Sequence, residues 1–291
     1  MSNNYIKILL LAGLALCFIS SFETNFSFAA PSPDAIAIRV IPNPEHLSAL
    51  DWYKIKAFGG SPQSILIDGY EAIRDGRTVY VNAANISGNS LYTNIYLISY
   101  DQNAQSATID IFGRILSHWK FNSNITGIGQ CKLNSLKNCL DDLDCEGGDY
   151  CLSQKAKIIR DVRRLADLVE AKTAINEHQA QVGSPPKLIS GTYLSGKTLS
   201  VWPSWSQTLT PELGLASLPV DPINKLGDCG EDRFNQITCW DENSKEFAGS
   251  IPSALPLESR VYAYQFVDED NYTLCAELET EYGNISSFDC L

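Results

Sequence analysis

The cysteines have the most recognisable chemistry in this sequence. Nine occur among the 291 residues; Cys17 lies in the apolar amino terminus, and the other eight all follow residue 130. An even number of cysteines beside only three histidines favours disulfides formed in an oxidising compartment. The sequence leaves their connectivity open. The eight candidates are Cys131, Cys139, Cys145, Cys151, Cys229, Cys239, Cys275 and Cys290.

The first four of these cysteines stand within 21 residues that contain few apolar side chains. Such a segment cannot build a core, so we expect two disulfides to hold it together. A zinc site with four cysteine ligands would use the same residues. Zinc sites usually pair their cysteines at short spacing, whereas the gaps here are seven, five and five residues. The spacing therefore favours a disulfide-bonded insert over zinc.

An acidic run inside this insert resembles the opening of a calcium-binding EF-hand loop. Asp142, Asp144 and Glu146 alternate and are followed by Gly147. The twelfth position of such a loop would be Ser153, which cannot supply the bidentate carboxylate that calcium needs there. We expect a disulfide-closed acidic turn, with a weak calcium contact as the alternative.

Patterns typical of catalysis are weak. The histidines are far apart, and the sequence has neither a nucleophile elbow nor a glycine-rich phosphate loop. Carboxylate pairs such as Asp141 with Asp142, or Glu277 with Glu279, could serve acid–base chemistry. On an acidic surface such pairs are usually solvated. We therefore predict a protein that is not an enzyme, and an extracytoplasmic enzyme is the least favoured hypothesis.

Aromatic residues suggest a second kind of site. Trp202 and Trp205, together with Tyr193, could form a platform on which sugar rings stack. Closely spaced tryptophans after a loop are more often buried over a sheet. Exposure of both indoles would favour the sugar platform, and burial of both would exclude it.

Composition narrows the functional classes. Hydrophobic residues make up 44% and charged residues 19%, which is typical of a folded protein with a sizeable core. The formal net charge is −12. An acidic chain repels the phosphate backbone, so we expect no nucleic-acid partner.

The amino terminus indicates export. Residues 8–22 form an uncharged apolar run that is short for a membrane-spanning helix. Ser27 and Ala29 then occupy the small-residue positions of a secretory cleavage site. We expect residues 1–29 to be a cleaved signal peptide, and the protein to be secreted, extracellular or at the cell surface. An uncleaved anchor is the alternative, and this segment would then be the only contact with the membrane.

The part of the chain before the insert, residues 30–126, is rich in β-branched and aromatic residues. This composition predicts a β-rich domain, with a hairpin over 77–100 that turns at 85–90. Two short helices are expected at 46–56 and 115–119. The predicted strands are 35–41, 64–68, 78–82, 91–100 and 108–112.

The pattern changes to helical after the insert. Ile158, Val162, Leu165 and Val169 recur at helical spacing, and the neighbouring charged residues are expected mainly on other, polar faces. Gly183 should end this helix near residue 181. Two strands at 260–267 and 272–278 form a terminal hairpin.

Together these elements predict an α+β fold: a β-rich amino-terminal domain, a small disulfide-bonded insert and a carboxy-terminal α+β domain. The predicted segments are 1–29 for the signal peptide, 30–126 for the β-rich domain, 127–153 for the insert and 154–291 for the last domain.

One ordered set of motifs resembles a known family. Arg160-Asp161 opens the helix, Gly183-Ser-Pro-Pro186 breaks it, and Leu218-Pro-Val-Asp-Pro222 precedes the terminal hairpin. Residues 157–279 thereby resemble the globular domain of type IV pilin-like proteins, especially major pseudopilins of type II secretion systems. The whole chain resembles exported proteins of candidate-phylum bacteria that place such a domain behind a β-rich one. The resemblance implies a long helix packed on an antiparallel sheet.

The resemblance also implies a metal site and a role. Major pseudopilins often bind calcium before their last strands, and carboxylate and carbonyl oxygens suit that ion. The alternative is a simple turn among solvated acids. The corresponding residues here are Asp221, Asn224, Asp228, Glu231 and Asp232.

Cys229 and Cys239 flank that loop and could close it. The family polymerises through an apolar helix that continues into the sheet-packed one, but here a long stretch of chain intervenes. We therefore expect a non-enzymatic protein with protein partners at the cell envelope, in an extracellular assembly or in adhesion. The alternative is a carbohydrate- or peptide-binding module.

Overall fold

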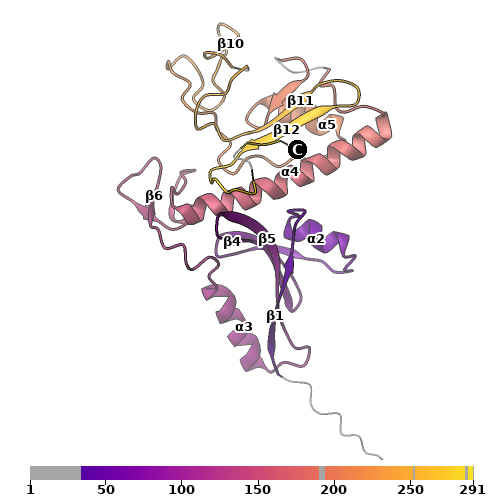
Figure 1. Cartoon of the computed structure of the whole chain (residues 1–291), viewed down its shortest axis with the longest axis vertical. Coiled ribbons are helices and arrows are strands. Elements are labelled where there is room, and N and C mark those ends of the chain that lie inside the picture. The colour runs from indigo at the N-terminus through magenta and orange to yellow at the C-terminus, as the bar shows by residue number, and fades with distance from the viewer. Residues whose placement is uncertain (1–33, 190–193, 252, 286–287, 291) are drawn as a thin grey trace, which may run out of the picture.

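The computed structural model describes residues 34–189, 194–251, 253–285 and 288–290. The expected signal peptide, Cys17 and Tyr193 lie outside these residues. The described chain is a mixed α+β structure in which two antiparallel sheets lie on opposite sides of one long helix, α4 (Figure 1). The predicted α+β class is confirmed at this level.

The first sheet contains five antiparallel strands in the order β1-β5-β4-β3-β2. The predicted hairpin is present, with Ser87 paired to Ser90 across its turn. β1 and β2 are the two edges of this sheet. The strands are β1 Ile36–Pro42, β2 Gln63–Ile67, β3 Tyr70–Asp75, β4 Thr78–Ser87 and β5 Ser90–Tyr100.

Two predictions in this region were incomplete or wrong. β3 was not predicted, because three of its six residues are charged and its burial does not alternate: the adjacent Ala72 and Ile73 are both buried, whereas Glu71 is exposed. The strand expected at 108–112 is wrong, since these residues belong to helix α3, Ser106–His118. Alternating isoleucines favoured a strand, but the helix lets Phe112 pack against Tyr100 with ring centroids 5.0 Å apart.

Helices cover both faces of the first sheet. α2, Ala49–Ile55, lies on one face and buries Trp52 and Tyr53 against Tyr80. The Ser48 side chain caps this helix by accepting a hydrogen bond from the Asp51 amide. α3 and the amino-terminal half of α4 cover the opposite face.

α4 spans Gln154–Val182 and confirms the predicted helix. The Ser153 hydroxyl caps its start, and Gly183 ends it with a φ of 89°, a left-handed conformation that glycine adopts readily. None of the helices in the described ranges is both long and apolar enough to cross a membrane.

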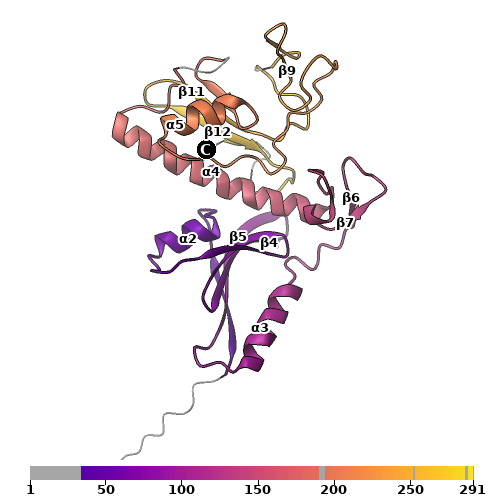
Figure 2. The same cartoon turned by 180° about the vertical axis from the view of Figure 1, so that it is seen from behind.

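Two hydrophobic cores share α4. Ile158, Val162 and Leu165 pack into the core of the first sheet. Further along the helix, Leu168, Ala171 and Ile175 pack into the core of the second. Figure 2 shows the first sheet on one side of α4 and the second sheet on the other.

The charged side chains of α4 correct another expectation. Arg160, Arg164 and Asp167 were expected mainly on polar faces, yet all three are buried, as is Asp161. The helix has packed structure on more than one side, so its polar faces are covered too.

The second sheet has the order β13-β12-β11-β8. Its central hairpin, β11 with β12, confirms the predicted terminal hairpin. Between α4 and this hairpin the chain forms a π-helical turn at Trp205–Leu209 and the short α5, Thr210–Glu212. The remaining strands are β6 Gly129–Gln130, β7 Asn138–Cys139, β8 Lys197–Leu199, β9 Trp240–Asp241, β10 Glu246–Phe247, β11 Tyr262–Phe266, β12 Tyr272–Glu277 and β13 Phe288–Cys290.

The predicted disulfides are present. Cys131 bonds Cys145 and Cys139 bonds Cys151 within the insert, while Cys229 bonds Cys239. Cys275 is also disulfide-bonded, and the register of β12 on β13 places Cys290 opposite it. The insert therefore uses its cysteines in disulfides rather than as zinc ligands. Several disulfides are typical of a protein that folds outside the reducing cytosol.

Candidate functional site

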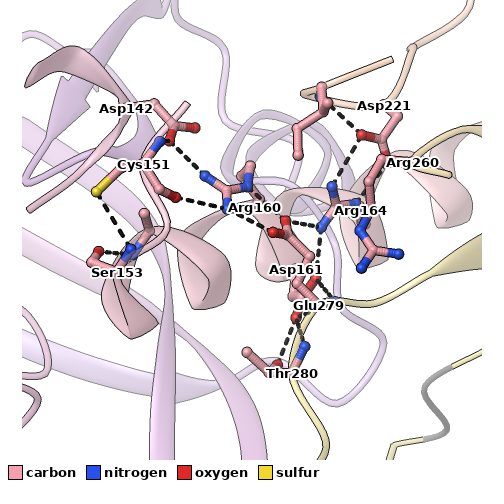
Figure 3. A network of polar contacts seen from close by, with 12 residues as sticks. Asp142, Cys151, Ser153, Arg160, Asp161, Arg164, Asp221, Arg260, Glu279 and Thr280 are labelled. Atoms are coloured by element: carbon pink, nitrogen blue, oxygen red, sulfur yellow. Dashed lines mark hydrogen bonds and ion pairs between the residues drawn. The ribbon is translucent and has the colours of Figure 1, made fainter. Parts of the chain in front are cut away.

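The most concentrated chemistry in the described chain is a buried network of charges on the amino-terminal half of α4 (Figure 3). Arg160 lies at its centre. Its Nε and Nη2 donate to the two carboxylate oxygens of Glu279 at 2.6 and 2.7 Å, and Nη1 donates to Asp142 Oδ1 at 2.5 Å. Nη2 also donates to the Cys151 carbonyl at 3.1 Å. Arg160 thus ties α4 to the insert and to the chain after β12.

Arg164, one turn along, extends the network to the Asp-Pro loop. Its Nε and Nη2 donate to the two oxygens of Asp221 at 2.6 and 3.0 Å. Its Nη1 donates to Asp161 Oδ1 and Glu279 Oε1 at 2.8 and 2.7 Å. Arg164 and Asp221 are both fully buried along their side chains. Such bidentate pairs are strong and geometrically specific.

Asp161 completes the network with neutral donors. It accepts hydrogen bonds from the backbone amides of Glu279 and Thr280 and from the Thr280 hydroxyl. Burial raises the pKa of Asp161 even though Arg164 favours its charged form. Burial alone would also raise the pKa of Glu279, but the bonds from Arg160 and Arg164 lower it to about 2.

This network holds segments together. Its carboxylates come from the insert, α4, the Asp-Pro loop and the chain after β12, and its arginines are saturated by them. A charge bound this way is unavailable to a substrate. Sequence reasoning missed the network, although the spacing of Arg160, Asp161 and Arg164 placed them within one turn of helix.

The five residues proposed for calcium do not gather in one shell. Asp221 is bound to Arg164, and the Asn224 amide bonds the Ser200 side chain and carbonyl. Asp228 accepts a bond from the Gly230 amide. Glu231 pairs with Arg233, and Asp232 is exposed.

Within the described residues, the metal-capable side chains that converge are Cys131, Cys139 and Cys145, and these are in disulfides. Calcium binding at the Asp-Pro loop therefore stays a prediction that this arrangement does not support.

The acidic side chains of the insert accept hydrogen bonds from neighbouring parts of the protein. Asp142 Oδ1 accepts the Cys151 amide as well as Arg160, and Asp144 accepts the amide of Leu140. Asp141 caps the short helical turn 142–144. These bonds build an acidic turn, the structure expected in preference to a calcium loop.

Trp202 and Trp205 are both buried, 6% and 1% exposed. Trp205 Nε1 donates to the Pro219 carbonyl, and Trp202 packs on Phe247 with ring centroids 4.6 Å apart. Both indoles are packed in the protein interior, so neither can stack on a sugar.

An open groove runs beside α4. It consists of two adjoining cavities of about 180 and 360 Å³ that share Ser48, Ala49, Leu66 and Glu71 in their walls. We call this the α4 groove. Along one wall lies β2, the edge strand of the first sheet, which among the described strands has a neighbour on one side only. A free strand edge can pair with an added strand.

The α4 groove is acidic. Five carboxylates and two guanidinium groups line it. The charged residues are Glu71, Asp141, Asp142, Asp167, Glu170, Arg160 and Arg163. Burial raises the pKa values of Asp141 and Glu170, which means that these carboxylates are poorly solvated. A cation placed in the groove would favour their charged forms.

Asp167 connects this groove to the second sheet. The Tyr262 hydroxyl donates to its Oδ2 at 2.7 Å, and Arg163 Nε lies 3.6 Å from the same oxygen. Burial raises the pKa of Asp167 to about 7, in spite of these two partners. Asp167 is thus a titratable group in the wall of the groove, packed against β11.

No protein family, curated protein or solved structure matches this chain. The function is therefore argued from the chain's own side chains. They offer a saturated, structural charge network and an acidic groove along an open strand edge.

Proposed function

We propose that this is an exported, non-enzymatic protein in which a pilin-like unit serves as the scaffold of an extracellular assembly. Support comes from the order and packing of α4 and the second sheet, in which a long helix lies on an antiparallel sheet. The Asp-Pro loop contributes as well, because Asp221 clamps Arg164 of the helix. The paired state of the buried arginines favours a structural role over catalysis.

The packing of α4 also argues against filament formation by the family mechanism. Such polymers use an exposed apolar helix. Here Ile158, Val162 and Leu165 are covered by the first sheet of the same chain. We infer that the unit does not polymerise through this helix and instead acts by binding a partner.

We propose that this partner binds in the α4 groove. Within the described residues β2 offers an unpaired strand edge, its own Leu66 is 52% exposed, and the surrounding charge is mainly negative. The complementary ligand is an extended peptide segment that adds a strand to β2 and alternates apolar with basic residues. Its Lys or Arg side chains would meet Glu71, Asp167 and Glu170.

Peptide display tests this proposal. Random peptides selected on the whole protein should converge on alternating apolar and basic residues. Leu66→Arg and Glu170→Lys should each weaken a selected peptide by about tenfold or more, equivalent to roughly 1.4 kcal/mol.

Ile55→Arg is the matched control, because Ile55 is 65% exposed and does not line the groove. Selected peptides without basic residues, or binding that survives both groove substitutions, would refute the proposal.

A further inference from the structure

A separate cavity of about 400 Å³ lies at the turn end of the β4–β5 hairpin. β1 ends at Pro42 opposite Asn94, so it does not pair with the first residues of β5. Two neighbouring segments contact this stretch of β5 instead. The backbone N–H of Asn43 donates to the Thr93 carbonyl at 2.9 Å. The Asn284 side chain accepts a hydrogen bond from the Leu91 backbone N–H and donates one to the Leu91 carbonyl. The cavity is thus built by three distant parts of the chain.

The cavity differs from the rest of the molecule in its charge. The chain carries 34 acidic and 22 basic residues. Yet among the described residues that line this cavity there is no Asp, Glu, Lys or Arg. Four of the lining residues are asparagines instead: Asn43, Asn85, Asn94 and Asn284. Besides Tyr92, the ionisable side chain among these lining residues is His46, whose Nδ1 lies 3.1 Å from the Thr93 hydroxyl oxygen. A pocket so rich in amides and so poor in charge favours a neutral polar ligand.

Three side chains share one face of the hairpin at this cavity. Asn85 lies directly opposite Tyr92 across the strand pair, and Asn94 follows Tyr92 by two residues on β5. Tyr92 is 49% exposed. Within the described residues, the Asn85 and Asn94 amides make no hydrogen bond to protein, so both keep donors and acceptors for a ligand.

We propose that this cavity binds a neutral saccharide. The Tyr92 ring offers an apolar face to the C–H groups of a sugar ring. The Asn85 and Asn94 amides each combine a donor and an acceptor, which suits hydroxyl groups that both donate and accept. A pocket of this size with an aromatic wall and a few polar groups is typical of small-ligand sites. The inference rests on residues outside the α4 groove and does not depend on peptide binding there.

Saturation-transfer NMR on the whole protein tests it. The probes are three neutral trisaccharides, maltotriose, mannotriose and triacetylchitotriose, with trigalacturonate as a charged counterpart. At least one neutral trisaccharide should receive saturation from the protein, and trigalacturonate should not. Tyr92→Ala removes the stacking face, and Asn94→Asp removes an amide donor and adds a carboxylate to a pocket whose described lining has none. Each variant should weaken binding by about tenfold or more.

Two controls separate binding from folding. Tyr92→Phe keeps the ring and should bind within about threefold of the wild type. Asn124→Asp makes the same chemical change at an exposed position outside the cavity and should have no effect. The proposal is overturned if no neutral trisaccharide binds at about 10 mM, well above an ordinary millimolar Kd, if Tyr92→Ala binds like the wild type, or if trigalacturonate binds equally well.

Discussion

At the scale of single residues, the interior charges of α4 are the least expected feature of the molecule. Helical periodicity identified Ile158, Val162 and Leu165 correctly as core positions, whereas Val169 is only half-buried. Periodicity says only which residues prefer a core. It cannot show that Arg160 and Arg164 would meet carboxylates from distant segments and become buried. Those partners are far along the chain, and only the fold brings them within hydrogen-bonding distance.

Arg164 provides the first prediction. Arg164→Met should lower the free energy of unfolding by about 3–5 kcal/mol, because it leaves Asp221 and Asp161 without their buried counter-charge, whereas Glu279 keeps its pair with Arg160. Arg163→Met is the matched control at the preceding position of the same helix. The Arg163 side chain is 43% exposed, so the cost should stay below about 1 kcal/mol. Urea unfolding measures both, and equal effects would contradict the structural role of Arg164.

Asp167 provides a prediction of pH dependence. Its pKa is raised by burial to about 7, above the value of about 3.9 in an unfolded chain. Between these values the folded state binds more protons than the unfolded state, so the free energy of unfolding falls as pH rises from about 4 to 7. Asp167→Asn should make this decline shallower without abolishing it, since Asp141, Asp161 and Glu170 keep raised pKa values. It should stabilise the protein at pH 8 by roughly 1–4 kcal/mol.

Urea unfolding from pH 4 to 8 measures this effect. The amide oxygen introduced by Asp167→Asn can still accept the hydrogen bond from Tyr262, so the substitution removes mainly the charge. Glu177→Gln is the control, since Glu177 is an exposed acid of the same helix. An unchanged decline in Asp167→Asn would show that another group causes it.

At the scale of elements, local patterns predicted what local interactions determine. α4, the β4–β5 hairpin and the terminal hairpin each have caps, turns or periodicity within their own sequence. The prediction of a strand within α3 was wrong because the isoleucines there alternate like those of a strand. What decides its conformation is the packing of Phe112 on Tyr100, a contact with another element.

The insert illustrates how covalent and ionic links combine at this scale. Its interleaved disulfides hold Asp142 and the Cys151 carbonyl against Arg160. Replacing Cys139 and Cys151 with serine should cost about 2–4 kcal/mol. It should also reduce hydrogen-exchange protection in the first turns of α4.

Replacing Cys229 and Cys239 is the matched control, because that disulfide closes a loop of similar length, for which the described structure shows no hydrogen bond or ion pair to α4. It should leave protection of the first turns of α4 unchanged. Equal loss of protection in both variants would mean that the insert does not brace the helix.

At the scale of the whole molecule, α4 joins what the sequence suggested as separate units. The boundary expected at 127–153 coincides with the insert, yet the core of the first sheet takes Ile158, Val162 and Leu165 from beyond it. Length and cysteine distribution suggested the segments but could not show which core each face of a helix would join. That depends on how the two sheets pack around it.

Shared packing predicts cooperative unfolding. Because both sheets need α4, neither core can lose it and remain folded, so heating should give one transition with equal calorimetric and van't Hoff enthalpies. Ile158→Ala and Ile175→Ala remove buried side chains from the first and second core respectively. Each should cost about 2–5 kcal/mol and lower the same single midpoint. Two resolved transitions, with each substitution shifting only one, would show that the cores are independent and that α4 merely connects them.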